Sequence, residues 1–295
     1  MDVSIIIVNY NTKQLLYNCL MSIYEQTKDI DFEIIVSDNG SIDGSNEMIH
    51  MDFPHVILIK NNSNLGFGTA NNIGAKAAKG KYLFFLNSDT IILNNAIKVL
   101  VDYLESNAKA GVCGGNLFDE NKKPTFSYEM FLPSVIREIN IFLKLAIEKI
   151  LFRENSRFNH TNNPKKVGYI SGADLLIRTD LFRRLNGFDP DFFMYYEETE
   201  LTYRVKKVGY KVYNIPQAHI LHLEGKSLSD NLTKQRISLK SRKIYYMKTY
   251  DIFLQHIVNS IFSLTILSRC VLYKLTGNIA GYNYWVFISK NLRTL

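Results

Sequence analysis

The sequence predicts an α/β fold in which helices flank a mostly parallel central sheet, followed by a helical C-terminal extension. The first observation is that short apolar runs alternate with segments of helical periodicity as far as Gly114. Strands that alternate with helices form right-handed βαβ crossovers, and these lay the strands parallel. The second observation is the run Val3–Val8, VSIIIV, which is continuous and β-branched, as in a strand covered on both faces.

The individual elements follow in order from these two patterns. Apolar, β-rich runs predict strands over residues 3–8, 33–36, 56–59, 82–86 and 112–114. Residues that recur at helical spacing predict helices over residues 15–23, 45–51, 69–78 and 95–105.

Polar residues follow three of the predicted strands: Asn9-Tyr10-Asn11, Ser37-Asp38-Asn39-Gly40 and Asn87-Ser88-Asp89. One polar loop is an ordinary feature of any protein. In a parallel sheet, however, the carboxyl ends of the strands share one edge, and ligands bind there. The three loops together therefore predict a binding site.

The segment NLGFGTANNIG, Asn64–Gly74, is a glycine- and asparagine-rich entry to a helix. One interpretation is a turn with a helix cap, in which Gly74 allows close packing. The other is a row of backbone amides that faces an anion. The segment lacks the Gly-Lys-Ser/Thr of a Walker loop and the register of a dinucleotide fingerprint.

Charge divides the chain into two parts. The formal net charge is +7, yet from Leu232 onward ten basic residues face the single acid Asp251, so the first 231 residues are slightly acidic. We expect an α/β domain over residues 1–231, with an inserted amphipathic segment over 126–166. A basic, amphipathic helical extension follows over 232–295. This distribution argues against a nucleic-acid partner.

The cysteines and the N-terminus predict a cytoplasmic protein. Cys19, Cys113 and Cys270 are widely spaced in apolar surroundings, which favours reduced thiols over a disulfide framework. Strand-like residues begin at Val3 with no basic and apolar leader before them.

Six motifs in this order resemble the inverting family 2 glycosyltransferases. The match is closest to the rhamnosyltransferase-like branch that builds bacterial surface polysaccharides, and it covers roughly Val3–Lys248. The motifs are SIIIVNYNT, EIIVSDNGSIDGS, NLGFGTANNIG, FLNSDT, SGADLLIRTDLFRRLNGFDPDFFMYYEETEL and HLEGKS. The resemblance implies the nucleotide-sugar-binding α/β fold called GT-A.

The resemblance also implies the substrates and the residues that contact them. The donor is a dTDP- or UDP-sugar, with rhamnose as the candidate sugar, and the acceptor is a hydroxyl of a glycan or of a lipid-linked glycan. The donor-binding positions are Val8, Asn9, Tyr10, Asp38, Asn64, Gly66, Asn71, Ser88, Asp89 and Lys226. The acceptor-side positions are Gly172, Ala173 and Tyr196. Further candidates for the donor diphosphate are Arg242, Lys243 and Lys248.

A divalent cation, Mg²⁺ or Mn²⁺, is the implied cofactor. Oxygen ligands and such a cation neutralise a diphosphate leaving group. The family's Asp-x-Asp motif is Asn87-Ser88-Asp89 here, which leaves Asp89 as its ligand. A lone strand histidine is usually a packed residue, but the resemblance of HLEGKS makes His222 the second ligand. His219, three positions earlier, falls on the opposite strand face and is expected to be structural.

The catalytic base is expected in Glu197-Glu198, which follows the aromatic run FFMYY. Acids in a first helical turn are also explained by the helix dipole. An aromatic wall, however, desolvates a carboxylate and raises its basicity, which a general base needs. The resemblance places the base at Glu198, where the family has Asp, and leaves Glu197 as the alternative.

The inserted segment and the tail carry apolar faces. A helix over residues 135–150 either packs on the domain or faces a membrane. Residues 252–268 are apolar, but Arg269 follows after about 17 residues, short of the roughly 20 that span a bilayer. Basic residues interleaved with tyrosines over 234–248 suit an anionic membrane surface at the inner face of the cytoplasmic membrane. The alternatives are a helical cap and a homodimer interface.

The rival function is a non-catalytic nucleotide-sugar-binding or membrane-docking protein on the same fold. Asn87 and Glu198, each in place of a family Asp, favour this rival. A nucleotidyltransferase would need a Gly-rich, basic loop after the first strand, and Asn9-Tyr10-Asn11-Thr12 is not such a loop.

Overall fold

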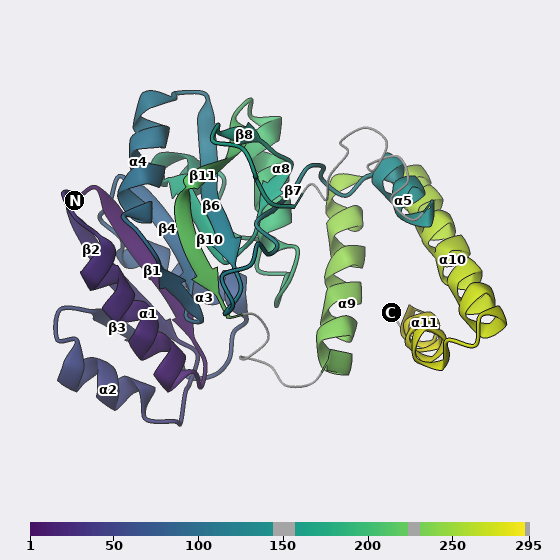
Figure 1. The fold of residues 1–295 in the computed structure, drawn as a ribbon, viewed down its shortest axis with the longest axis horizontal. Coiled ribbons are helices and arrows are strands. Elements are labelled where there is room, and N and C mark those ends of the chain that lie inside the picture. Colours follow the sequence, from purple (N-terminus) through teal and green to yellow (C-terminus); the bar gives the residue numbers. More distant parts are fainter. Residues whose placement is uncertain (144–156, 224–230, 293–295) are drawn as a thin grey trace. The chain divides into compact units, whose positions relative to one another are not determined.

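The computed structural model describes residues 1–143, 157–223 and 231–292, which form two compact units (Figure 1). The first unit comprises residues 1–130 and 157–229, and the second comprises residues 131–156 and 230–295. Residues 131–143, which are part of the inserted segment, therefore group with the C-terminal helices.

A mixed sheet runs through the first unit. Its strand order is β3 (Ile57–Lys60), β2 (Phe32–Asp38), β1 (Val3–Asn9), β4 (Tyr82–Asn87), β10 (Asp174–Arg178), β6 (Ala110–Phe118), β11 (Lys211–His222) and β5 (Thr90–Ile92), with β8 (Lys165–Lys166) paired to β11. The strands β1, β2, β3, β4, β6 and β11 run in one direction, and β10, β5 and β8 oppose them. A separate pair joins β7 (Tyr128–Glu129) to β9 (Tyr169–Ile170).

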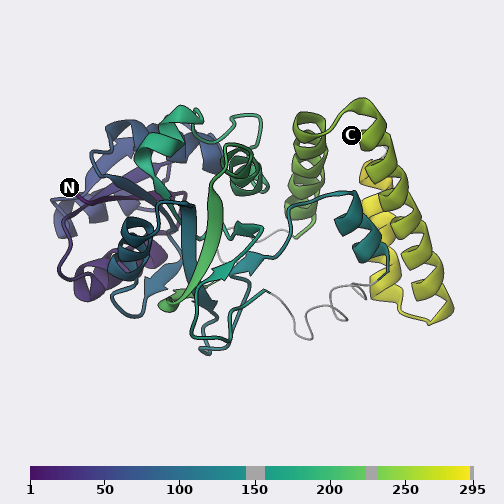
Figure 2. The same ribbon diagram turned by 90° about the horizontal axis from the view of Figure 1, so that it is seen from above.

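Helices cover both faces of this sheet, as Figure 2 shows from above. On one face lie α1 (Lys13–Gln26), α2 (Ser45–Asp52) and α4 (Ala96–Ser106). On the other lie α3 (Phe67–Ala77), α7 (Thr179–Arg184) and α8 (Glu197–Lys207). The α/β class and the strands and helices predicted as far as Gly114 are confirmed, most of them longer than expected.

The core explains why the first strand is continuously apolar. Ile5 and Ile7 pack under α1, α2 and α4, whereas Ile6 packs on the opposite side, and all three are fully buried. Alternate side chains of a strand point to opposite faces, so a strand covered twice needs apolar residues at every position. A Cβ at Gly74 of α3 would lie 2.6 Å from Ile6, which confirms that this glycine permits close helix–strand packing.

The strand β10 was not predicted. It inserts antiparallel between β4 and β6, pairing Leu175 with Phe85 and Leu176 with Cys113. Its first residue, Asp174, is fully buried, and the carboxylate Oδ2 accepts a hydrogen bond of 2.5 Å from the Gly115 amide. Burial raises the pKa of this carboxyl well above its usual range, which favours its protonated form.

The substitution Asp174→Asn is expected to stabilise the protein increasingly as the pH rises. A carboxyl with a raised pKa binds more protons in the folded state than in the unfolded state, so stability falls above the unfolded pKa of about 3.9. Asparagine keeps an oxygen that accepts the hydrogen bond from the Gly115 amide, but it does not titrate and so adds no pH dependence to stability. The midpoint of thermal unfolding should exceed the wild-type value at pH 8 and approach it at pH 4. An equal difference at both pH values, or the same trend in the exposed control Asp52→Asn, would contradict this explanation.

The second unit consists of helices. They are α5 (Val135–Phe142), α9 (Asn231–Thr249), α10 (Ile252–Leu275) and α11 (Ile279–Leu292). The prediction of a helix from residue 135 is confirmed as far as Phe142, and residues 144–150 lie outside the described part of the chain.

The prediction that the apolar tail segment stops at Arg269 is wrong. The helix α10 continues to Leu275, and its 24 residues are long and apolar enough to cross a membrane. Only 17% of its apolar window is buried. Arginine is a good helix former, so Arg269 does not interrupt α10. Its guanidinium donates to the carbonyls of Ile141 (3.0 Å) and Phe142 (2.9 Å) at the end of α5.

Arg242 is engaged inside the second unit. It is 6% exposed, lies 3.0 Å from the carboxylate of Glu138, and stacks over the Phe262 ring at 4.0 Å. The Tyr246 hydroxyl donates to the same carboxylate at 2.8 Å. These contacts contradict the expectation that Arg242 reaches a donor diphosphate, because its charge is already compensated.

Candidate active site

The ends of β1 and β2 meet as predicted. Asn9 and Asp38 are register partners, and the Asn9 amide donates to Asp38 Oδ1 at 2.7 Å and to Ser41 Oγ at 3.0 Å. The other Asp38 oxygen accepts from the backbone amides of Gly40 (3.2 Å) and Ser41 (2.9 Å). Gly40 has a φ of 82°, which suits glycine in this turn. These bonds hold a buried carboxylate at the carboxyl edge of the sheet.

Thr12, which the sequence did not single out, connects the ends of β1 and β2 to Ser88, the residue just after β4. Its hydroxyl donates to Asn9 Oδ1 at 2.7 Å and lies 2.9 Å from Ser88 Oγ. Val8 pairs on either side with Ser37 and Asn87. Tyr10 directly follows β1, and its side chain is 41% exposed, so an aromatic ring is accessible at this edge of the sheet.

The loop before α3 is held by asparagines and by the aromatic run. Asn64 Oδ1 accepts from the Gly66 amide (3.0 Å) and from Asn39 Nδ2 (3.2 Å). Gly66 has a φ of 83°, and a Cβ there would lie 2.2 Å from the Phe193 carbonyl oxygen. The Phe67 amide donates to that same oxygen at 2.8 Å. This first amide of α3 therefore holds the aromatic run.

Asn71, another predicted donor residue, is buried on α3. Its amide nitrogen donates to the Phe67 carbonyl at 3.1 Å, and its Oδ1 has no hydrogen-bond partner among the described residues. The predicted donor residue Lys226 lies outside the described residues.

The two predicted metal ligands lie together. Asp89 Oδ1 is 3.3 Å from His222 Nε2, and the amide nitrogen of Asn87 is 3.4 Å from the same ring nitrogen. Asp89 is 5% exposed and His222 9%. The pairing of β5 with β11 sets His222 opposite Thr90 and brings together residues far apart in sequence.

This donor set fits a divalent cation. A carboxylate oxygen and an imidazole nitrogen that each bind a metal at about 2.1 Å lie roughly 3 Å apart when the ligand–metal–ligand angle is near 90°. Within the described ranges, no group of three His, Cys, Asp or Glu side chains surrounds such an ion. Phosphate oxygens of a substrate and water would complete the coordination, a common arrangement for Mg²⁺.

The acidic pair begins α8 after two residues of unusual backbone geometry. Tyr195 and Tyr196 both have a φ of 68°, in the left-handed region that bulky residues rarely adopt. Such strain is concentrated at functional sites. The turn presents Glu197 and Glu198 at the start of the helix.

The two carboxyls have different environments. Glu197 is 4% exposed and its Oε2 has no hydrogen-bond partner in the described structure. Burial, together with the neighbouring Glu198 charge, raises the pKa of Glu197 well above its usual range. Burial also raises the pKa of Glu198, but this half-buried carboxyl accepts a hydrogen bond of 3.2 Å from Thr199. Burial therefore disfavours the charged form of both carboxyls, and Glu198 has the hydrogen-bond donor that Glu197 Oε2 lacks among the described residues.

Gly172 and Ala173 join the acidic pair to the metal ligands. A Cβ at Gly172 would lie 3.8 Å from Glu198 Cγ and 3.7 Å from the Phe67 ring. The Ala173 carbonyl accepts from the Asn87 amide at 3.0 Å. Of the predicted acceptor-side residues, Gly172 thus lies beside Glu198 and Ala173 bonds to Asn87, while Tyr196 lies in the left-handed turn before α8.

Arg204 holds α8 against the rest of the first unit, a role that the sequence did not reveal. Its guanidinium pairs with Glu200 at 2.6 Å and donates to the carbonyls of Leu185 and of Gly187, the latter at 2.8 Å. From α3, Asn72 donates to the Phe188 carbonyl (2.7 Å) and accepts from its amide (2.9 Å). The helices α3 and α8 are therefore held by the same short segment, residues 185–188.

The substitution Arg204→Lys is expected to lower kcat by roughly ten- to a hundredfold, because small displacements of a catalytic group are costly. The lysine keeps a positive charge for Glu200 but loses the fork that reaches two carbonyls. Donor affinity, measured by calorimetry, should change little. The control Glu200→Gln retains the carbonyl bonds and should keep most of the activity. A wild-type kcat for Arg204→Lys would exclude this positioning role.

Solved structures with the same fold include two glycosyltransferases with bound nucleotide. One is the mannosyltransferase PcManGT from Pyrobaculum calidifontis, in complex with GDP-Man and Mn²⁺, at a TM-score of 0.60 and 14% identity over 98% of this chain and 84% of that chain. The other is GalNAc-T7 with UDP, GalNAc and Mn²⁺, at a TM-score of 0.62 and 19% identity over 86% and 49% of the chains. At these identities the likeness shows the fold, and it confirms the GT-A prediction.

Relatives in sequence include two rhamnosyltransferases. The N-acetylglucosaminyl-diphospho-decaprenol L-rhamnosyltransferase of Mycobacterium tuberculosis is 28% identical over 205 residues, 64% of this chain. Rhamnosyltransferase WbbL of Escherichia coli is 30% identical over 166 residues, 53% of this chain. The chain spans 66% and 60% of the length of these relatives. The profile of glycosyl transferase family 2 matches residues 4–183, and the chain belongs to this family.

Proposed function

We propose that this protein is an inverting, metal-dependent glycosyltransferase. It moves a sugar from a nucleoside-diphosphate sugar to a hydroxyl of a glycan or lipid-linked acceptor in bacterial surface polysaccharide synthesis. One observation carries the proposal: the Glu198 side chain lies beside Gly172, and the next residue, Ala173, bonds to Asn87, which contacts the buried Asp89–His222 pair.

The proposed reaction is a single displacement. Glu198 accepts the proton of the acceptor hydroxyl, whose oxygen then bonds to the anomeric carbon. The bond from that carbon to the diphosphate oxygen breaks on the opposite face, and its electron pair leaves with the nucleoside diphosphate. A Mg²⁺ or Mn²⁺ ion held by Asp89 and His222 would neutralise the charge of that leaving group. Asn9 and Asp38 orient the nucleoside.

Rhamnose is the proposed sugar because two relatives are rhamnosyltransferases. A thermal-shift panel of dTDP- and UDP-sugars with and without Mn²⁺ tests this donor class. A donor at a hundred times its Kd stabilises the folded state by about 2.7 kcal/mol. We expect a dTDP-sugar with Mn²⁺ to raise the midpoint of unfolding most. No shift with any nucleotide sugar would contradict the proposal, and a shift without transfer to any acceptor would favour the non-catalytic rival.

For its location, we propose the inner face of the cytoplasmic membrane, where the protein is peripheral. The supporting observation is the charge of the second unit, whose described residues include ten basic side chains and two acidic ones. Anionic lipids attract such a surface. A relative from Escherichia coli, the glucosyltransferase WfaP, has a diphosphoundecaprenol-linked acceptor in its name, and such lipid carriers reside in membranes.

A further inference from the structure

The helix α10 carries an exposed apolar stripe. At 100° per residue, its members fall within an arc of about 80° on one side of the helix. They are Phe253 (70% exposed), Leu264 (56%), Leu267 (61%), Val271 (50%) and Leu275 (81%). The stripe is continuous from Leu264 to Leu275, and the exposed Ser260 separates that part from Phe253. Apolar surface of this kind marks an interaction site.

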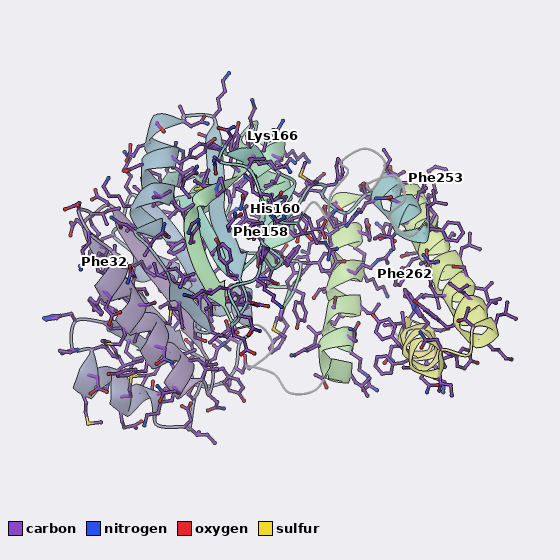
Figure 3. The ribbon with its side chains drawn as sticks, in the orientation of Figure 1. Phe32, Phe158, His160, Lys166, Phe253 and Phe262 are labelled. Atoms are coloured by element: carbon purple, nitrogen blue, oxygen red, sulfur yellow. The ribbon has the colours of Figure 1, made fainter. Side chains whose placement is uncertain are left out.

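Among the described residues, the buried cluster of the second unit includes none of the five stripe residues. The buried residues of α10 are Val258, Thr265 and Ile266, which lie on other sides of the helix. Phe262 packs with the cluster shared by α9, α10 and α11, and it projects from the side opposite Phe253 (Figure 3). The core of the second unit therefore does not require apolar residues at the stripe positions. A partner outside the unit explains why these positions are apolar.

Polar side chains border the stripe along its N-terminal half. His256, Asn259, Ser260 and Ser263 line an open hollow of about 500 Å³ together with two leucines of the stripe. Toward the C-terminal end, the exposed Lys274 lies beside Val271 and Leu275. The surface therefore places hydroxyl, imidazole and ammonium groups next to apolar side chains, an arrangement that matches the headgroup and acyl boundary of a bilayer.

From this surface we infer that α10 lies in the plane of an anionic membrane with the stripe (Phe253, Leu264, Leu267, Val271 and Leu275) immersed at the acyl boundary. The inference rests on the proposed function and names the surface through which the enzyme meets its membrane. The in-plane orientation follows because other sides of the same helix pack on α5, α9 and α11, and Phe262 of α10 lies under the guanidinium of Arg242 from α9. A helix that spanned the bilayer would have to leave those contacts.

Charge distinguishes the membrane from a second copy of the chain as the occupant. Two copies would each bring ten basic residues against two acidic ones, counted over the described residues of the second unit. One of those acids, Glu138, is already paired with Arg242 in the interior. Like charge opposes self-association, whereas the same charge is attracted to anionic lipids.

The test compares full-length variants in sedimentation with vesicles. The double substitution Leu264→Gln/Leu267→Gln should weaken binding to phosphatidylcholine–phosphatidylglycerol vesicles at least tenfold. Leu264→Met/Leu267→Met should bind as the wild type does. Met51→Gln, which removes an apolar side chain of the first unit that is more exposed (73%) than either leucine, is the control. Wild-type binding should fall with added salt and be weak for phosphatidylcholine alone.

Unchanged vesicle binding by the glutamine variant would overturn the inference. So would a wild-type dimer, detected by light scattering, that the same variant dissociates. Circular dichroism checks the fold, and the single variant Phe253→Gln replaces the double variant if the latter unfolds. Transfer to a soluble acceptor analogue should be equal in all variants. Its absence in the wild type would count against the proposed function and leave the membrane result standing.

Discussion

Replacing Glu198 by glutamine is expected to lower the rate of sugar transfer by a factor on the order of 10² to 10⁴, the usual contribution of a general base. Glutamine has nearly the same shape but accepts no proton from the acceptor hydroxyl. Donor binding should persist, because the groups assigned to the donor lie on other elements. Single-turnover transfer and calorimetric donor titration separate the two effects.

The matched control for this experiment is Glu197→Gln. Burial and the adjacent charge raise the pKa of Glu197 well above its usual range, which favours the protonated form of this carboxyl. A neutral amide should therefore preserve most of the activity. If Glu198→Gln transferred sugar at the wild-type rate while Glu197→Gln did not, the two roles would have to be exchanged.

The same assignment predicts how activity depends on pH. Burial raises the pKa of Glu198, and a base works only after it has lost its proton. The value of kcat should therefore rise with pH through an acid limb that lies above the ordinary carboxyl range. Activity that is constant across that range, measured where the protein stays folded, would remove Glu198 as the titrating base.

Removing the divalent cation is expected to weaken donor binding at least tenfold, the second large effect. The diphosphate carries most of the donor's charge, and without the ion it would face the Asp89 carboxylate directly. Titration of a nucleotide sugar into wild-type protein, with Mn²⁺ and after treatment with EDTA, measures the effect without relying on turnover.

Asp89→Asn and His222→Ala should each bind the donor weakly and respond little to EDTA. Asp102→Asn, on the exposed side of α4, is the control and should behave as the wild type does. Donor affinity that is indifferent to EDTA in the wild-type protein would remove Asp89 and His222 from the metal role.

Local patterns predicted the layers of the fold and one corner of the site. The continuous run around Ile5, Ile6 and Ile7 predicted a strand covered on both faces, and the structure confirms that cover. The polar residues after the first two strands predicted a common edge, where Asn9 does bond to Asp38. Such inferences succeed because strand periodicity and parallel register are local properties that a few residues determine.

The rest of the site depends on contacts between residues that are distant in sequence. The proximity of His222 and Asp89 was expected from the family resemblance, but only the pairing of β5 with β11 produces it. No local pattern indicated that Arg204 would bond to the carbonyls of Leu185 and Gly187, since an arginine four residues after a glutamate also suits an isolated helix.

By itself, the sequence determined which strands are buried, where the polar strand ends fall, and that the basic charge is concentrated in the C-terminal part. Only the tertiary structure decided that β10 enters between β4 and β6, that Arg269 of α10 bonds to the last carbonyls of α5, and which of two adjacent glutamates is the more deeply buried. The physical reason is the same in each case. Strand insertion, a helix cap supplied by another segment and the pKa of a carboxyl all depend on neighbours that the folded chain brings from elsewhere.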